Sequence, residues 1–570
     1  MAESINIKNT SSTTELGNPK KQTKKLTKKQ ILLICFLFAA LAILASFPLI
    51  SHKFPVTTDF LFHYQRLLGM VKSFSSGHWP IINTQFLNGL GYPVDLFYSN
   101  FFLLPIAFLG SHGVTLILSL KIFFMLVTFA TFLSMFWSTN VVAKSPMVSF
   151  VAATLYGFSF FRLRDLYYRV GIGSITIFIF IPLIIAGYYQ IFYKKDNKGW
   201  IALTLGMSGL ILSHVITTFL VIIGLVVWTL AIWRRWDKKS LLQVLKAALF
   251  TTGLTAFFTL PMIEQMLSYD YFAKNHPVVF LETSTVSLFR FISDNFTIFP
   301  FSSYLISLPI LLALLLGIFL IKSKKSNLRT LANVSLIIGF ALLFLMLPII
   351  PWKTIRTALP LLNSIQYVNR LIPLALPFLS FSAAAYVVLL ANKFGKNWSK
   401  IIPTLVVLVV AGTSIPYLNA VQDLSFGKAP INPDSFKIGG GKEYLPADTK
   451  LKYLKSLDVT TVVAADNSSL TVNSFERKDT NLNVAGTSNT EQAITLPLLY
   501  YKGYTAKLNG KAIPISISDK HLIKVQVPKG TFKLAIRYSG TTVQHLAVWV
   551  SFLSLILFFA YLVLLHKQRK

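Results

Sequence analysis

The chain has a single cysteine, Cys35, among 570 residues. One cysteine cannot form an intrachain disulfide, and without neighbouring ligands it does not indicate a metal site. Acidic residues are also scarce, because 21 Asp and Glu stand against 54 Lys and Arg, a net charge of +33. This excess does not indicate binding of a nucleic acid. The basic residues form short clusters between apolar runs, and no soluble basic domain exists to hold a nucleic acid.

Nucleotide-binding and nucleophile motifs are absent as well. The chain contains no Walker loop, no dinucleotide fingerprint, no nucleophile elbow and no zinc-ligand spacing. Any chemistry therefore uses neither ATP nor a nucleotide held in a glycine-rich loop. The sequence identifies no cofactor, and a divalent cation stays open as an alternative.

Long apolar runs are abundant instead. Hydrophobic residues make up 54% of the chain, and the mean hydropathy is +0.61. Many runs are long enough to cross a hydrocarbon core of about 30 Å at about 1.5 Å per helical residue. The sequence excludes a soluble fold and predicts a polytopic α-helical membrane protein with about twelve transmembrane helices. The expected spans are 30–50, 112–137, 146–161, 172–192, 200–213, 215–233, 242–266, 303–321, 330–350, 367–390, 400–419 and 543–565.

The stretch 200–233 decides the number of spans. It is long for one crossing and short for two. Basic clusters at 194–198 and 234–239 flank it. Both clusters are expected in the cytoplasm, so the chain must cross an even number of times between them. We predict two short crossings with a turn at 213–214; a re-entrant segment is the alternative.

Charge and polarity also predict the domain organisation. Residues 1–30 are polar and basic and lack a cleavage site, so we expect a disordered cytoplasmic tail before a retained anchor helix. Residues 31–419 form the transmembrane core, with a long outer loop at 51–111. Residues 420–542 form an extracytoplasmic, mostly β domain, and 543–570 contain the last span and a basic cytoplasmic end. Both termini are therefore expected in the cytoplasm.

Strand signals occupy the second half of the outer insert. Segments 504–508, 512–517, 522–527 and 532–538 alternate apolar and polar residues. Asn509-Gly510 lies between the first two, and this dipeptide is a strong hairpin signal because both turn positions need positive φ. We predict a small antiparallel β-sandwich before the last span.

The first outer loop contains one candidate chemical site. Residues 59–66 read DFLFHYQR. On a helix Asp59, His63 and Arg66 share one face, because they stand at positions i, i+4 and i+7. A polar juxtamembrane helix with a satisfied ion pair is the alternative.

The second outer loop is richer in cations. Arg162, Arg164 and Arg169 lie on the side where positive charge is disfavoured. Ionisable residues at membrane depth usually have a partner and a function. The planar guanidinium fork suits a phosphate, which it binds through two charge-assisted bonds. Snorkelling to lipid headgroups is the alternative.

Three further residues are predicted on the same face of the membrane. They are His214 at the turn of 200–233, Glu264 at the outer end of its span, and Arg370 before the tenth span. A histidine at a helix turn is more often a packing hydrogen bonder than a ligand. The shared side of the acids, the histidines and the arginines is nevertheless what an outward-facing site requires.

Several segments resemble the YfhO-like family of bacterial membrane proteins, which belongs to the GT-C class of polytopic glycosyltransferases. Related chains carry the label "6-pyruvoyl-tetrahydropterin synthase-related membrane protein", which does not indicate pterin chemistry. The likeness covers nearly all of the chain after the tail. The matching segments are 59–66, NGLGYP at 88–93, Phe97-Tyr98, the loop 156–173, PMIEQ at 261–265, IQY at 365–367, GGKEYLP at 440–446 and LPLLYYKGY at 496–504.

The resemblance implies inverting transfer of a sugar from a polyprenyl-phosphate donor to an extracytoplasmic acceptor at the bacterial plasma membrane. Acceptors in the family are cell-surface polymers such as teichoic acid. An acidic residue of the first outer loop acts as base or orients the acceptor in that class, and Asp59 occupies its position. The family pattern has a Glu where Ser174 stands and a Phe-Pro-Trp-Arg run at 367–370, so the chain departs from it twice.

We therefore expect a GT-C-like fold and these partners: a polyprenyl-phosphate sugar, a polymer acceptor and membrane lipid, but no nucleic acid. The transfer needs a base near the acceptor hydroxyl and cations on the leaving phosphate. The predicted catalytic residues are Asp59, His63 and Glu264. The predicted donor-binding residues are Arg66, Arg162, Arg164, Arg169, His214 and Arg370.

Two other functions fit the same sequence. One is a transporter or flippase of a lipid-linked precursor, although transporters place their ionisable residues at the bilayer midplane. The other is a non-catalytic scaffold whose outer domain binds glycan, and such a scaffold would not need Asp59.

Overall fold

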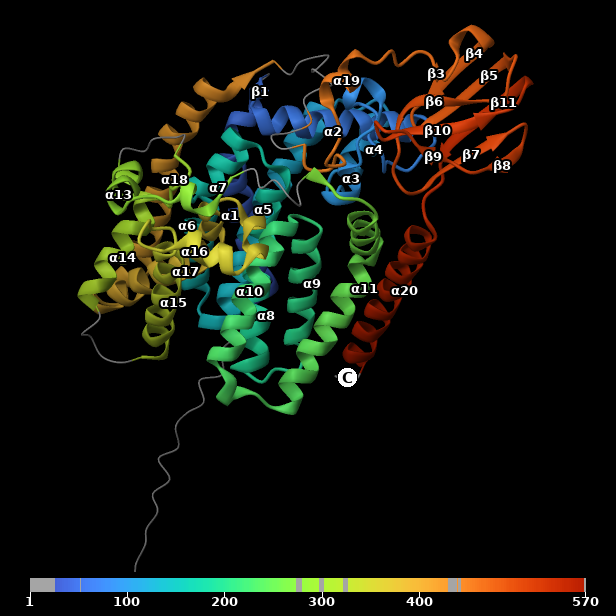
Figure 1. Cartoon of the computed structure of the whole chain (residues 1–570). Helices are drawn as coiled ribbons and strands as arrows, with labels where there is room; N and C mark the ends of the chain where they lie inside the picture. Colours follow the sequence, from blue (N-terminus) through green and yellow to red (C-terminus); the bar gives the residue numbers. More distant parts are fainter. Residues whose placement is uncertain are drawn as a thin grey trace, which may run out of the picture.

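The computed structural model describes residues 26–51, 53–272, 279–296, 302–320, 326–428, 438 and 442–567. It contains a helical bundle with a β domain at one end (Figure 1). Several sequence predictions lie outside the described residues: the tail up to residue 25, the basic cluster at 322–325, Gly440-Gly441 and the last three residues.

Within the described residues, eight helices are long and apolar enough to cross a membrane. A ninth span results if the bent pair Pro146–Gly157 and Phe160–Arg169 is one crossing, with an angle of 40° between its two halves. The bundle is therefore that of a multi-pass membrane protein. The eight helices are α1 (Lys28–Ala45), α5 (Leu116–Ala143), α8 (Ile172–Phe192), α11 (Lys238–Ser268), α15 (Asn327–Phe344), α17 (Ile372–Lys393), α18 (Trp398–Ser425) and α20 (Thr542–Lys567).

Three other predicted spans form shorter apolar helices: α9 (Gly199–Ile211), α10 (Val215–Ala231) and α14 (Leu308–Leu320). A helix of 13 residues, such as α9, is only about 20 Å long at about 1.5 Å per residue. The number of twelve crossings stays a prediction for this reason, whereas length and composition alone support eight or nine.

The break expected inside 200–233 is confirmed. His214 is the N-cap of α10, and its Nδ1 accepts a hydrogen bond from the backbone N–H of Thr217 at 3.2 Å. Glycines let α9 pack tightly on α8, because a Cβ at Gly187 would lie 2.6 Å from the backbone nitrogen of Leu203.

The first outer loop is mostly helical and lies above the bundle in Figure 1. Its longest helix is α2 (Thr58–Ser75), which packs against α4 (Leu104–Ser111). Strand β1 (Phe54–Pro55) pairs with β2 (Phe426–Gly427), which follows α18 and ties the start of this loop to the outer end of that helix.

The remaining short helices of the chain are α3 (Val94–Phe97), α6 (Pro146–Gly157), α7 (Phe160–Arg164), α13 (Leu288–Phe296), α16 (Trp352–Ala358) and α19 (Leu451–Ser456).

Two antiparallel sheets with a common apolar core form the outer domain. The first contains four strands in the order β3 (Val463–Ala464), β6 (Gln492–Leu499), β10 (Leu522–Val527) and β9 (Ser516–Ile517). The second contains five in the order β4 (Leu470–Lys478), β5 (Asn481–Ser488), β11 (Gly530–Tyr538), β7 (Tyr504–Leu508) and β8 (Lys511–Ile513).

The predicted Asn-Gly hairpin is confirmed, since β7 pairs with β8 and both turn residues have positive φ, 49° at Asn509 and 83° at Gly510. The prediction of one strand over 512–517 is wrong. The chain leaves the five-stranded sheet after Ile513 and joins the other sheet at Ser516. Pro514 stands between them, and proline cannot donate a ladder hydrogen bond.

The first outer loop completes the core of the β domain. Phe86, Leu90 and Tyr92 are fully buried in the same apolar cluster as the strands. The backbone N–H of Leu499 donates to the carbonyl of Leu90 at 2.9 Å. The glycine-rich segment at 88–93 is therefore part of the packing between the two outer elements rather than a free loop.

Candidate outer-face site

Asp59 and Arg169 meet at the outer end of the bundle. Asp59 lies in the first turn of α2, and Arg169 is the last residue of η3 (Asp165–Arg169). The Nε of Arg169 donates to the Asp59 carboxylate at 3.0 Å, and both side chains are partly exposed, 32% and 42%. The hydroxyl of Thr57 also donates to the carbonyl of Arg169 at 3.2 Å. A residue from each predicted outer loop therefore contributes to one ion pair.

The segment that carries Arg169 has an unusual backbone. Residues Asp165–Arg169 form a π-helical turn, a feature that occurs frequently at functional sites. The next residue, Val170, has φ 56° and ψ 39°. A β-branched residue in this left-handed region is strained by on the order of 1–3 kcal/mol. The surrounding packing thus holds Arg169 in a conformation that local preference opposes.

Asp165 is a second carboxylate beside Arg169. Its side chain is 1% exposed and lies 3.9 Å from Arg169 and 3.5 Å from Arg164. A buried carboxylate needs such partners, because removing a charge from water is costly. Asp165 therefore holds the two arginines at the base of the site.

Arg370 brings another cation to the same place. Its guanidinium is half-buried and donates to the carbonyl of Ile365 at 2.6 Å and to the side chain of Gln366 at 3.0 Å. Gln366 has a φ of 65°, so this loop is also strained. Both acceptors are neutral, and Arg370 forms no ion pair with any carboxylate in the described ranges. The positive charges of Arg370 and Arg169 repel each other.

Two histidines and a tyrosine complete the group. The ring of Tyr98 lies 5.6 Å from that of His63 and 6.1 Å from that of His214. Burial lowers the pKa of His63 well below its ordinary value, and the charges of Arg66 and Arg169 lower it further. His63 is therefore neutral near pH 7, and its Nδ1 has no hydrogen-bond partner in the described part of the chain. We call Asp59, His63, Tyr98, Asp165, Arg169, His214 and Arg370 the outer cluster.

The β domain reaches the outer cluster through Tyr444. Its ring stacks on that of Phe97 at 4.8 Å, with 8° between the planes. The backbone N–H of Tyr444 donates to the hydroxyl of Tyr92 at 3.3 Å. Tyr444 also interacts electrostatically with Tyr98 and Arg370. The outer domain thus lies beside the site.

Two of the predicted donor-binding arginines have other partners. Arg66 is 1% exposed and forms an ion pair of 2.9 Å with Asp95, together with a bond of 2.7 Å to the carbonyl of Tyr98. Arg162 is fully buried and donates to the carbonyl of Gly157 and to the hydroxyl of Thr128. Both guanidinium groups are buried and bonded inside the protein, so neither is presented to a ligand.

Arg164 and Glu264 also differ from Arg169 in position. Arg164 donates to the hydroxyl of Ser303 at 3.0 Å in addition to its contact with Asp165, so it borders the outer cluster. Glu264 lies at the end of α11 and forms an ion pair of 2.9 Å with Lys502 of the β domain. It also accepts a hydrogen bond from Thr541 before α20. Glu264 thus joins the bundle to the β domain, away from the outer cluster.

Sequence reasoning did not assign Tyr98, Asp165 or Tyr444 to the site. Tyr98 and Tyr444 lie within segments that carried the family resemblance, and Asp165 stands between the arginines of the second loop. The sequence could have indicated Asp165, because it stands among arginines and ionisable residues at membrane depth usually have a partner. The described residues contain no group of three or more His, Cys, Asp or Glu side chains that could hold a metal ion.

The outer cluster is closely packed. A crevice of only about 10 Å³ lies behind Tyr98 and Gly173. A Cβ at Gly173 would lie 2.4 Å from both the Tyr98 hydroxyl and the carbonyl of Ser213, so only glycine fits there. A ligand must therefore approach from the exposed side of Asp59 and Arg169.

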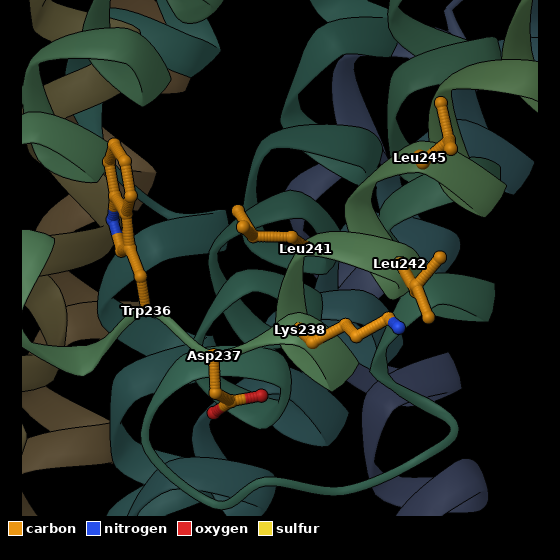
Figure 2. Close-up of a pocket in the computed structure, with 6 residues that line it drawn as sticks. All are labelled: Trp236, Asp237, Lys238, Leu241, Leu242 and Leu245. Atoms are coloured by element: carbon orange, nitrogen blue, oxygen red, sulfur yellow. The ribbon is translucent and has the colours of Figure 1, made fainter.

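A larger hollow lies at the other end of the bundle. It has a volume of about 400 Å³ and is lined by Trp236, Asp237, Lys238 and three leucines of α11. Figure 2 shows the indole of Trp236 and the carboxylate of Asp237 extending to opposite sides of the turn before α11. Asp237 pairs with Lys195. Exposed tryptophan and leucine side chains are typical of a surface that faces lipid, so this hollow is not a candidate active site.

Comparisons with known proteins give limited matches. No family model matches the chain. An uncharacterized protein of Lactococcus lactis subsp. cremoris (strain MG1363) is 26% identical over 339 residues, a match of 55% of this chain and 53% of the relative. The chain thus matches about half the length of that relative. The cryo-EM structure of the arabinofuranosyltransferase AftD from Mycobacteria aligns with a TM-score of 0.44 and 14% identity, over 71% of this chain and 27% of AftD.

Proposed function

We propose that this chain is a GT-C-type membrane glycosyltransferase that moves a sugar from a polyprenyl-phosphate donor to an extracytoplasmic acceptor. The observation that carries the proposal is the outer cluster itself. It combines one accessible carboxylate, Asp59, with Arg169 and Arg370, and the hydrogen-bond partners of Arg370 are neutral. A half-buried cation that forms no ion pair within the described part of the chain favours an anionic ligand. The sequence resemblance gives that ligand as a lipid phosphate.

The residues support a single displacement. The acceptor hydroxyl oxygen attacks the anomeric carbon, the bond from that carbon to the donor phosphate breaks, and the hydroxyl proton passes to the Asp59 carboxylate. The configuration at the anomeric carbon inverts. Arg169 and Arg370 hold the leaving polyprenyl phosphate, because charge-assisted bonds stabilise the negative charge that develops on it. His214 lies within electrostatic reach of both arginines and adds a donor to the phosphate.

The ion pair between Asp59 and Arg169 fits this sequence of events. Each group neutralises the other at 3.0 Å. A phosphate that binds Arg169 competes for its Nε and frees Asp59 for the acceptor. Donor binding would thereby prepare the base, which favours donor before acceptor. We assign neither Arg66, Arg162 nor Glu264 to the reaction, since their partners lie inside the protein.

The test is transfer by the purified full chain from defined undecaprenyl-phosphate sugars to a cell-surface polymer such as teichoic acid. Asp59→Asn should lower kcat by about 10²- to 10⁴-fold, the usual contribution of a positioned base. Asp519→Asn, on an exposed turn of the β domain, serves as the matched control and should keep full activity.

Two outcomes would contradict the proposal. One is movement of lipid-linked sugar across an intact membrane without any transfer, which would identify a flippase. The other is undiminished function of Asp59→Asn in cells, which would leave a scaffold whose outer domain binds glycan.

A further inference from the structure

A second cavity lies inside the bundle, in the half remote from the outer cluster. Its volume is about 340 Å³, which falls in the range of about 300–1,000 Å³ that small-molecule pockets occupy. Helices α5, α8, α10, α15 and α17 contribute its walls. The proposed transfer reaction uses none of its residues.

The walls are mostly apolar. Pro182 and Pro377 line the cavity from within α8 and α17, and Ala186 lies one turn beyond the first proline. Proline inside a helix removes a backbone hydrogen bond and displaces the preceding turn. These residues leave a space that neighbouring side chains do not fill. An apolar space of this kind suits a hydrocarbon chain.

Aromatic residues and one cation lie at the end of the cavity near the basic cluster at 234–239. Tyr193, in the turn after α8, accepts a hydrogen bond of 3.3 Å from the indole of Trp228. The guanidinium of Arg235 lies 4.6 Å from the centre of the Tyr193 ring. Tyrosine, tryptophan and arginine together are typical of the membrane–water interface.

Positive charge is in excess around this opening. Arg235 forms no ion pair with a carboxylate among the described residues. Lys194 contacts the carbonyl of Val141, lies 5.5 Å from the ring of Tyr189 and interacts electrostatically with Lys144 and Asp196. The nearby Asp237 is already paired with Lys195. The opening therefore offers a cationic rim above an apolar space.

We propose that this cavity binds one acyl chain of an anionic phospholipid from the leaflet opposite the outer cluster, with the lipid phosphate against Arg235. Charge complementarity at the rim selects an anionic head over a zwitterionic one. Basic pockets between transmembrane helices bind anionic headgroups in this way. This lipid site is separate from the site of sugar transfer.

Tryptophan fluorescence tests the proposal, because Trp228 lines the cavity. The full chain is placed in phosphatidylcholine vesicles that contain a small fraction of phosphatidylglycerol with brominated acyl chains. Brominated phosphatidylcholine at the same fraction is the comparison. The difference between the wild type and Trp228→Phe isolates the signal of Trp228 from that of the other tryptophans.

Brominated phosphatidylglycerol should quench Trp228 at about one fifth of the concentration that brominated phosphatidylcholine needs, as expected for one cation near an anionic lipid. Arg235→Gln should abolish this preference. Arg234→Gln is the matched control, because Arg234 lies over Trp233 and does not line the cavity. Ser335→Phe, which fills the cavity without touching the rim charge, should reduce quenching by both lipids.

Equal quenching by the two lipids would overturn the proposal and leave an ordinary bilayer chain in the cavity. Absence of any quenching specific to Trp228 would show that no chain enters. A preference that survives in Arg235→Gln would also overturn it. Loss of sugar transfer in Asp59→Asn has no bearing on these results, so the two proposals fail independently.

Discussion

The Nε of Arg169 donates a hydrogen bond of 3.0 Å to the carboxylate of Asp59, although 110 residues separate them in the chain. This contact joins the first turn of α2 to the end of a π-helical turn. It places an acid and a cation of the proposed transfer reaction in direct contact.

Arg169→Ala should weaken donor binding more than it slows the chemical step. Removing one charge-assisted contact to phosphate costs about 1.5–3 kcal/mol, or about 10- to 100-fold in donor KM. Arg169→Lys should recover part of the loss, because lysine keeps the charge but not the planar fork. The measurement is donor KM at fixed acceptor. Arg356→Lys is the control, since Arg356 pairs with Glu282 instead. Equal effects at both positions would contradict the phosphate assignment.

Asp95→Ala should destabilise the fold strongly. Both partners of the Arg66–Asp95 pair are 1% exposed, so the substitution leaves a buried guanidinium without its counter-ion. Breaking a buried pair costs about 3–5 kcal/mol, whereas replacing both partners by apolar residues is often neutral. The double substitution Arg66→Leu with Asp95→Leu should therefore be more stable than Asp95→Ala alone. Thermal unfolding of the full chain in detergent measures both. A mild effect of Asp95→Ala would contradict a structural role for this pair.

His63 should make the folded chain less stable as the pH falls below about 6.5. Burial depresses the pKa of His63 in the folded state, so the unfolded state binds more protons in this window. Stability then rises with pH by at most about 1.4 kcal/mol per pH unit from this group. The apparent melting temperature of the wild type should fall more between pH 7 and pH 5 than that of His63→Gln. Parallel pH profiles would show that His63 is not buried as a neutral group.

Asp479 should be required for docking of the β domain. Its buried carboxylate accepts hydrogen bonds of 2.8 Å from Ser73 of α2 and 2.7 Å from Thr84. Bonds to a charged group contribute about 1.5–3 kcal/mol each, so Asp479→Ala should loosen this interface. Hydrogen exchange should rise in β4 and β5 and in the end of α2. Asp458→Ala, a surface residue of the same domain, is the control. Unchanged exchange would contradict the anchoring role.

Cysteine labelling tests the topology. In a Cys35→Ser background, Ser111→Cys should react with an impermeant reagent added to intact cells. Lys195→Cys should react only after the membrane is opened, because 194–198 belongs to a basic cluster expected in the cytoplasm. Labelling of both positions from one side would break the proposed arrangement. It would also separate the outer cluster from the acceptor.

The sequence by itself determined the helical membrane character and the strands of the outer domain. Apolar runs of spanning length and the Asn509-Gly510 turn are local signals, and local physics decides them. The break at His214 was also predictable, because the flanking basic clusters are expected on the same side of the membrane and the chain must turn between them. The strand over 512–517 was misjudged, since alternation does not reveal a change of sheet at Pro514.

Only the tertiary structure decided which charged residues face each other. Sequence spacing placed Asp59, His63 and Arg66 on one helix face, but Arg66 turns to Asp95, whereas Asp59 meets Arg169 from another loop. Tertiary packing determines which group lies beside a buried charge, and that group can come from anywhere in the chain. The composition therefore fixed how many charges must be compensated. The fold alone placed Arg370, whose hydrogen-bond partners are neutral, beside Arg169 in the outer cluster, and this placement is the basis of the proposed phosphate site.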